Sequence, residues 1–149
     1  MLNFRPAVDE DWEAIERLLL ACDLPVAGAR AHLGAFVVAA EGDAMSGCVG
    51  AEVYGDAALL RSLAVRDERR GRGIADQLVS RLVASLEARG VRRLALLTTT
   101  AEAYFARRGF VVVAREDVPE AVRASEEFRG ACPASAVAMV YELRRHPGQ

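Results

Sequence analysis

The 149-residue sequence contains no lysine, so all 19 of its basic residues are arginine. This absence excludes Schiff-base chemistry, a lysine general base and a phosphate loop that ends in Gly-Lys-Ser/Thr. Only two histidines occur, so a histidine-dependent triad or zinc site would have to use His32 or His146. The three cysteines, Cys22, Cys48 and Cys132, lie far apart and form no CxxC pair, which is not metal-ligand spacing. We therefore expect no metal site.

Long apolar runs and a dominant charge are missing as well. No run approaches the 18 residues that a membrane-spanning helix needs, and the N-terminus lacks a hydrophobic signal core. Scattered cysteines in odd number are typical of a reducing compartment, so we expect a cytoplasmic protein. The formal net charge of -2 argues against binding nucleic acid or an anionic membrane through an overall field. Any anion site must be local.

What is present suffices for a globular fold. Apolar residues make up 52% of the chain and charged residues 27%, which predicts one domain over residues 1–149 with its own core. Periodicity and turn residues predict an alternation of strands and helices, and therefore an α/β or α+β fold with a mixed sheet and helices on its faces. The expected strands are residues 3–7, 35–40, 48–54, 57–65, 93–98, 110–114 and 136–143, and the expected helices are 9–24, 26–33 (a short turn), 73–89, 101–108 and 119–128.

Capping residues mark several of the expected helix ends. Asp9 is the expected N-cap of the first helix, and Thr99–Glu102 has the form of a capping box. Gly90 and Gly109 are expected to end two helices because glycine accepts the left-handed conformation of a C-terminal cap.

The segment between residues 63 and 75 carries the clearest chemical signal. A strand ends near Val65, two glycines follow, and a long amphipathic helix begins at Gly73 without a strong side-chain cap. A helix N-terminus with glycine-permitted close approach is an anion site, and Arg69, Arg70 and Arg72 add charge that suits a diphosphate. The alternative is a plain glycine turn with solvated arginines.

This pattern, Leu63–Val65 followed by Arg69–Ala75 and a long helix, resembles the acyl-CoA pyrophosphate loop of the GNAT N-acetyltransferases. The later Gly109-Phe110 pair after a short helix also resembles that family. Three further stretches resemble a small GNAT branch associated with arsenic-resistance operons, itself similar to short bacterial N-acetylglutamate synthases; they are residues 54–65, 97–100 and 118–136. The resemblance implies the GNAT fold, with a mixed, mostly antiparallel central sheet of six or seven strands and helices on both faces.

The resemblance also implies acetyl-CoA as cosubstrate and direct transfer of its acetyl group to an amine. The backbone of Leu63, Ala64 and Val65 would pair with the pantetheine arm. The cofactor-binding set that the family implies is completed by Arg70, Gly71, Arg72, Gly73, Ile74, Ala75 and Phe105.

Three positions depart from the family pattern. Glu68 places a carboxylate near the expected phosphates, and we expect it to face solvent. Leu59 stands where many members carry a general-base Glu, so the base must lie elsewhere. Phe105 stands where many relatives have the Tyr that protonates the departing thiolate; the neighbouring Tyr104 is the candidate acid, with a packing aromatic as the alternative.

Glu52 is the preferred base, because a carboxylate in an otherwise apolar strand needs a reason or a partner. The alternative is an ion pair between Glu52 and Arg61 across the hairpin. Arg61 itself lies in an apolar strand, so it should face a polar cleft or a partner, and it is the candidate for binding a substrate carboxylate. Thr98 and Thr99 end the next strand and complete the candidate substrate site, although Thr99 can also serve only as a helix cap.

The sequence thus predicts an acetyl-CoA-dependent N-acetyltransferase that acts on a small amino acid or an amino-acid-like compound, including arsenic- or phosphorus-containing glutamate analogues. Acetylation of glutamate itself is the nearest alternative. A catalytically weak acyl-CoA-binding sensor is the alternative from another class. No nucleic acid or membrane partner is expected, and a homodimer is left open because dimers are common in the family.

Overall fold

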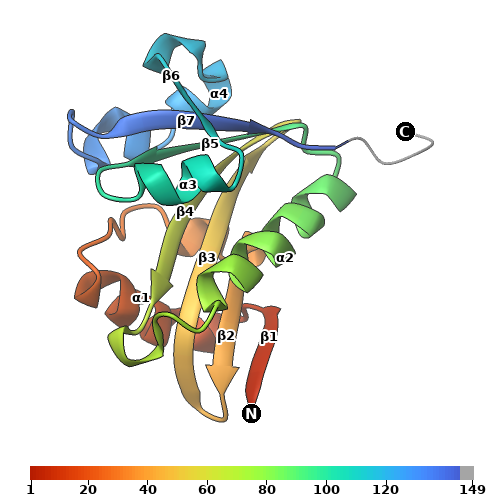
Figure 1. The fold of residues 1–149 in the computed structure, drawn as a ribbon, viewed down its shortest axis with the longest axis vertical. Coiled ribbons are helices and arrows are strands. Elements are labelled where there is room, and N and C mark those ends of the chain that lie inside the picture. Colours follow the sequence, from red (N-terminus) through yellow and green to blue (C-terminus); the bar gives the residue numbers. More distant parts are fainter. Residues whose placement is uncertain (145–149) are drawn as a thin grey trace. The chain divides into compact units, whose positions relative to one another are not determined.

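The computed structural model describes residues 1–144, so His146 lies outside the described residues. Seven strands form a mixed sheet in the order β1-β2-β3-β4-β5-β7-β6 (Figure 1). The β4–β5 pair is parallel, whereas β1–β2, β2–β3, β5–β7 and β6–β7 are antiparallel. The expected fold class, with a mixed sheet of about seven strands and flanking helices, is confirmed. The elements are β1 (Leu2–Pro6), α1 (Trp12–Ala21), β2 (Val37–Glu41), β3 (Ala44–Tyr54), β4 (Ala57–Val65), α2 (Ile74–Ala88), β5 (Arg93–Thr98), α3 (Glu102–Arg107), β6 (Val111–Val113), α4 (Glu120–Arg123) and β7 (Val137–Glu142).

The chain divides into two compact units. Unit 1 comprises Met1–Ala51 and Arg61–Ser85, and unit 2 comprises Glu52–Leu60 and Leu86–Gln149. Strands β3 and β4 contribute residues to both units. None of the helices in the described part of the chain is both long and apolar enough to span a membrane.

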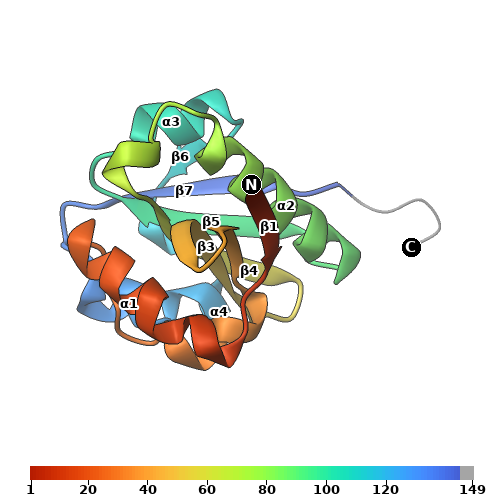
Figure 2. The same ribbon diagram turned by 90° about the horizontal axis from the view of Figure 1, so that it is seen from below.

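In unit 1, α1 and α2 lie on opposite faces of the strands (Figure 2). Neighbouring residues of β3 show the reason, because side chains alternate between the two faces of a strand. Cys48 belongs to the core on the α1 side, whereas a side chain at Gly47 would point at Ile74 and Leu78 of α2. The α1 core consists of Trp12, Ile15, Leu18, Leu19, Ala29, Leu33, Phe36, Val38, Cys48 and Ala64.

Unit 2 has an apolar core between the sheet and α4, and an aromatic cluster beside α3. Phe110 packs edge-on against Phe105 with ring centroids 5.3 Å apart and stacks on Tyr141 at 5.1 Å. Gly109 is required beside this cluster, since its φ is +99° and a Cβ there would lie 3.0 Å from the Tyr141 ring. The core on the α4 side consists of Ala57, Leu59, Ala95, Val118, Val122, Ala138 and Val140.

Strands β4 and β5 occupy the residues that the sequence predicts, and Gly90 follows α2 with a φ of +85°. The N-terminal cap is different. Asp11, not Asp9, accepts the Val8 backbone N–H at 2.8 Å, and Asp11 also accepts two hydrogen bonds from Arg5. The predicted capping box is also wrong, because the Thr98 hydroxyl accepts the Ala101 N–H at 2.9 Å and no side-chain cap is formed at Ala101.

Two further expectations differ from the structure. The loop expected between the second and third strands is only a tight turn at Gly42, since β3 begins at Ala44. The helix expected over residues 119–128 is reduced to the four residues of α4. A separate π-helical turn follows at Glu127–Ala131. Ser125 interrupts the expected helix, because its hydroxyl accepts the Phe128 N–H at 3.4 Å and offers the backbone an alternative to the helix.

Candidate functional site

The loop between β4 and α2 presents free helix amides. Asp67–Arg69 forms a short 3-10 turn, and Gly71 and Gly73 then adopt φ values of +80° and +77°. The first backbone N–H with an acceptor at this end of α2 is that of Gln77, which donates to the Gly73 carbonyl at 3.2 Å. The amides of residues 73–75 therefore have no acceptor inside the helix. Amides in this position form an anion-binding site.

Arg70, one of the residues expected to bind the pyrophosphate, already uses its backbone N–H in another hydrogen bond. The Arg70 backbone N–H donates to the Asp67 carbonyl at 3.2 Å and closes the 3-10 turn. Its guanidinium donates to the Val65 carbonyl at 3.2 Å and pairs with Asp67 at 2.8 Å. The backbone amides that remain to bind a pyrophosphate are thus those of residues 71–75. Arg70 can contribute to that binding only through its side chain.

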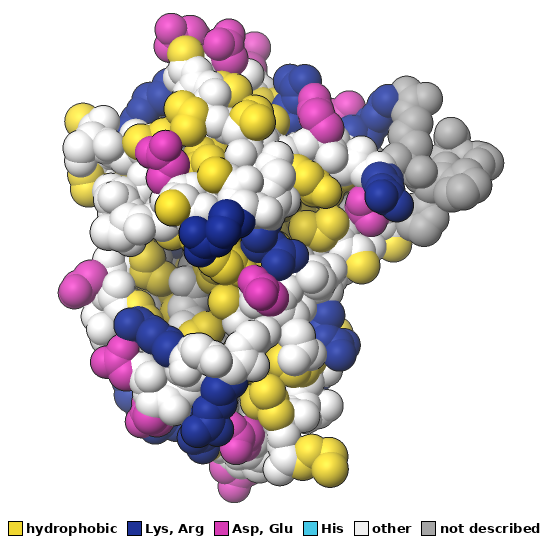
Figure 3. All heavy atoms as spheres, in the orientation of Figure 1, with side chains coloured by type: hydrophobic (Ala, Val, Ile, Leu, Met, Phe, Trp, Pro, Cys, Tyr) yellow, Lys and Arg dark blue, Asp and Glu magenta, His cyan; other side chains and the backbone are white. Residues whose placement is uncertain are grey.

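Acidic partners balance much of the loop's positive charge. Arg66 pairs with Glu68 at 3.0 Å, and Arg69 pairs with Glu41 at 2.7 Å. Glu68 faces solvent, as expected; a hydrogen bond from its own backbone and then the one from Arg66 lower its pKa. Figure 3 shows basic and acidic side chains interspersed over the visible face, an arrangement that does not form a broad basic patch.

The C-terminal part of β4 lies at the edge of the strands of unit 1. The register between β4 and β5 covers Ala57–Leu59 and Arg93–Ala95, whereas β4 continues to Val65. Ser62 is buried in β4 with a φ of +64°, a conformation that non-glycine residues rarely adopt. The backbone of the predicted pantetheine-binding residues, Leu63–Val65, follows directly after this distortion.

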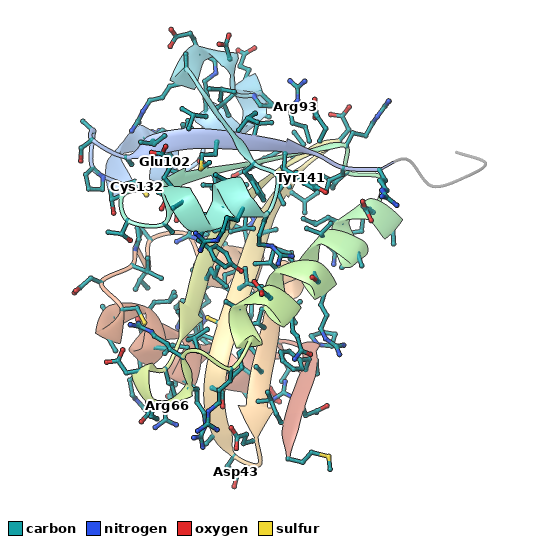
Figure 4. The ribbon with its side chains drawn as sticks, viewed as in Figure 1. Asp43, Arg66, Arg93, Glu102, Cys132 and Tyr141 are labelled. Atoms are coloured by element: carbon teal, nitrogen blue, oxygen red, sulfur yellow. The ribbon has the colours of Figure 1, made fainter. Side chains whose placement is uncertain are left out.

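A cavity of about 440 Å³ adjoins the loop on the α1 side of unit 1. Arg66 from the loop and Asp43 from the β2–β3 turn both contribute to its wall (Figure 4). The rest of its lining combines apolar side chains with the charged groups of the loop: Ala14, Arg17, Leu18, Ala21, Cys22, Ala44, Met45, Asp67, Glu68 and Arg70.

Glu52 lies at the C-terminal end of β3 and is 2% exposed. The Tyr54 hydroxyl donates a hydrogen bond to its carboxylate. Residues two apart on a strand share a face, so this partner could have been inferred from the Glu-Val-Tyr sequence, although the prediction considered only Arg61. The expected pairing of Glu52 with Arg61 stays a prediction.

Arg61 is 2% exposed and makes contacts that the sequence does not indicate. Its guanidinium donates to the carbonyls of Ala27 at 2.8 Å and Pro25 at 3.0 Å, and Nε donates to the Ser62 hydroxyl at 3.1 Å. The expectation of a polar partner is met by backbone carbonyls. Carboxylate binding by Arg61 stays a prediction.

The other candidates lie at the end of β5 and on α3, in unit 2. Thr98 is half-buried and caps the Ala101 N–H, whereas Thr99 is exposed and is not the cap. Tyr104 is half-buried and packs edge-on against Phe105 with ring centroids 5.1 Å apart. Phe105 is 5% exposed, within the aromatic cluster. The structure thus places the loop and Arg61 in unit 1, and Glu52, Thr98 and Tyr104 in unit 2.

None of the three cysteines forms a disulfide among the described residues, and Cys22 packs against the core that contains Cys48. Burial raises the pKa of Cys48 to about 12, with a smaller contribution from Cys22. Cys22 and Cys132 are half-buried. Among residues 1–144, no group of three or more His, Cys, Asp or Glu side chains is arranged to hold a metal ion.

Sequence comparison agrees with this geometry. A family model described as an acetyltransferase (GNAT) domain matches residues 32–112, more than half of the chain. The chain therefore belongs to the GNAT acetyltransferase family, and the expected enzyme class, an acyltransferase, is confirmed. No curated protein matches the sequence.

Solved structures share the fold at low sequence identity. N-acetylglutamate synthase from Neisseria gonorrhoeae, solved with coenzyme A and N-acetyl-glutamate, is 21% identical with a TM-score of 0.83; the match covers 97% of this chain and 36% of that one. Rv2747 from Mycobacterium tuberculosis, solved with CoA, is 23% identical with a TM-score of 0.79, covering 95% and 99% of the two chains. A GNAT acetyltransferase from Staphylococcus aureus is 13% identical with a TM-score of 0.75, covering 97% and 100%. The chain thus spans about a third of the gonococcal enzyme.

Proposed function

We propose that this enzyme transfers the acetyl group of acetyl-CoA directly to the amine of a small amino acid or amino-acid-like compound. The observation that supports acetyl-CoA as the cosubstrate is the geometry of the loop before α2. There, glycines at positive φ precede the free amides at the start of a 15-residue helix. These amides suit the pyrophosphate of CoA. A glycine cradle also lets the phosphates approach the backbone closely.

The backbone edge of β4 is the proposed binding site for the pantetheine arm of acetyl-CoA. The pantetheine arm carries amide groups, so it can pair with the backbone of Leu63–Val65 as an added strand would. In this proposal the thioester would lie along this segment of β4, which directly follows the buried, distorted Ser62. A backbone amide near Val65 would polarise the acetyl carbonyl while the amine attacks it.

Glu52 is the proposed general base. Its buried carboxylate, oriented by the Tyr54 hydroxyl, can accept the proton that the amine must lose before or during attack. Tyr104 is the proposed acid for the departing CoA thiolate, in place of the hydroxyl that Phe105 lacks. Thr98 and Thr99 are proposed substrate contacts at the end of β5.

The acceptor is proposed more narrowly from two sources. Similarity to the gonococcal synthase solved with N-acetyl-glutamate favours glutamate or a compound of its shape. The resemblance of residues 54–65, 97–100 and 118–136 to the arsenic-operon branch favours an arsenic- or phosphorus-containing analogue instead. The buried Cys48 thiol gives no support to an arsenic-binding thiol cluster, so arsenic would enter only as part of an acceptor.

The deciding experiment measures free-thiol release from acetyl-CoA against a panel of amino acids, with glutamate and its phosphorus- and arsenic-containing analogues included. Mass spectrometry then checks each acceptor for one added acetyl group. Because the chain has no lysine, acetylation of the enzyme's own side-chain amines cannot obscure the result. Release that depends on an added amine supports the proposal. Measurable CoA binding without turnover on any amine would favour the sensor alternative.

A further inference from the structure

Residues 25–29, between α1 and β2, form a turn that pairs the Val26 carbonyl internally, whereas the carbonyls of Pro25 and Ala27 accept hydrogen bonds from a distant side chain. The Ala29 N–H donates to the Val26 carbonyl at 3.0 Å, and Gly28 occupies the third position of this turn with a φ of +79°. A turn of this kind needs glycine at that position, and the carbonyl of its central peptide, here that of Ala27, points out of the turn. A polar group in this position needs a partner elsewhere.

Arg61 provides that partner from β4. Its two terminal nitrogens donate to Ala27 at 2.8 Å and to Pro25 at 3.0 Å, across 34 and 36 residues of sequence. The planar guanidinium is suited to hold two acceptors at once, and its burial shields both hydrogen bonds from water. One side chain therefore fixes the conformation of the turn and attaches it to the strand.

The same side chain contacts the distortion in β4. Nε of Arg61 donates to the hydroxyl of Ser62, which has a φ of +64°, and the Ser62 carbonyl accepts the Cys48 thiol at 3.3 Å. Leu63, the first residue of the proposed pantetheine-binding segment, follows at once. Arg61 thus connects the turn to the part of β4 where the thioester is proposed to lie.

We infer that Arg61 is a positioning residue, which sets the acceptor side of the reaction centre by holding the turn at residues 25–29 on β4, and does not act by pairing with an acceptor carboxylate. This inference rests on the proposed amine acetylation. The turn, placed by Arg61, would form part of the wall against which the amine is held.

The kinetic test uses Arg61→Lys, which keeps the positive charge but lacks the planar fork. The expected result is a KM for the amine raised at least about 10-fold, with the dissociation constant of acetyl-CoA within about 3-fold of the wild-type value. Gly28→Ala should raise the same KM, because it disturbs the turn and leaves Arg61 in place. The double variant should be no worse than the more severe single variant, whereas multiplied effects would overturn the inference.

Two controls make the test specific. Arg123→Lys alters an arginine of unit 2 whose Nε donates to the Val118 carbonyl at 3.1 Å, and it should leave the amine KM unchanged. An amino acid acceptor is then compared with its carboxamide. If Arg61 acts by positioning the turn, Arg61→Lys should lower kcat/KM by the same factor for both acceptors. A loss confined to the acceptor with the free carboxylate would show direct ion pairing and overturn the inference.

A readout that needs no turnover separates this inference from the proposed function. Hydrogen exchange of the Ala29 amide, measured with CoA present, should be at least about 10-fold faster in Arg61→Lys than in wild type, because the turn loses its anchor. Unchanged exchange in a variant that still binds CoA would overturn the inference. Failure of every amine as an acceptor would instead overturn the proposed function, while the exchange result still decides the role of Arg61.

Discussion

The ring of Phe36 occupies the space where Gly50 has no side chain. A Cβ at position 50 would lie 2.1 to 2.4 Å from three carbons of that ring. Gly50 lies on β3 on the same face as Cys48, toward the core that contains Phe36. The glycine is thus needed for close packing.

Gly50→Ala should destabilise the protein by about 1 to 3 kcal/mol, because a methyl group there forces the buried Phe36 ring to move. Urea unfolding followed by circular dichroism measures the change. Gly34→Ala is the matched control, since a Cβ at Gly34 would meet nothing within 4 Å. Equal stability of the two variants would contradict the packing argument. In a Phe36→Leu background, the added cost of Gly50→Ala should shrink.

The fold could be predicted where the pattern was local. Strand β4 is an apolar run bounded by the Gly55 turn and by charged residues, so its limits were found from the sequence. Hydrogen bonds from side chains to backbone were harder to predict. Asp9 and Asp11 do not differ as caps by residue type; the turn begins after Val8, so that Asp11 stands at its third position, where it accepts the Val8 N–H and pairs with Arg5.

The candidate site was predictable in the loop and poorly predictable around Arg61. Glycine spacing before a long helix is a local signal, and it located the free amides at the start of α2. The partners of Arg61 are the carbonyls of Pro25 and Ala27, and no side-chain pattern marks a carbonyl more than 30 residues away. Burial of a cation in an apolar strand indicated that a partner was needed, but not which one.

Asp11 should stabilise the protein in a pH-dependent way. Hydrogen bonds from Arg5, ahead of that from the Val8 amide, hold the pKa of this carboxyl below its ordinary value. The stabilisation is therefore fully present above the unfolded-state pKa of about 3.9 and is lost as the pH falls through the lower folded-state value. Asp11→Asn should cost about 1 kcal/mol at pH 7, and its Tm difference from wild type should vanish in acid.

The exposed pair of Arg93 and Glu142 is the control for this experiment. Their side chains are 46% and 63% exposed, so Glu142→Gln should change stability by no more than about 0.5 kcal/mol at pH 7. A Tm difference for Asp11→Asn that persists unchanged to pH 2 would show that charge is not the cause.

Thiol labelling should distinguish Cys48 from the other two cysteines. With its pKa raised to about 12 by burial, only about one Cys48 in 10⁴ is a thiolate at pH 8. Native protein treated with iodoacetamide should gain two adducts quickly, at the half-buried Cys22 and Cys132, and a third only after unfolding. Rapid labelling of all three in native protein, read by mass spectrometry, is the contrary outcome.

Gly73→Ala should weaken CoA binding beyond its effect on stability. The residue has a φ of +77°, so alanine costs about 1 kcal/mol and distorts the amides proposed to hold the pyrophosphate. Gly90→Ala is the matched control, because Gly90 has a φ of +85° and equally open space at the other end of α2. Both variants should lose similar stability, but only Gly73→Ala should raise the dissociation constant of CoA in calorimetry. Equal CoA affinity in both would refute the loop assignment.

Glu52→Gln should lower turnover at neutral pH by about 100-fold or more if Glu52 accepts the amine proton, since the amide cannot act as a base. CoA affinity should hardly change, because the proposed CoA contacts are backbone groups of the loop and β4. Glu68→Gln, which removes an exposed carboxylate of the loop, should keep its rate and serves as the control. The decisive measurement is the rate-versus-pH curve at saturating acetyl-CoA. If Glu52 is the base, the variant should regain rate as rising pH deprotonates the free amine in solution, whereas a variant curve that follows the wild-type curve at every pH would remove Glu52 from this role.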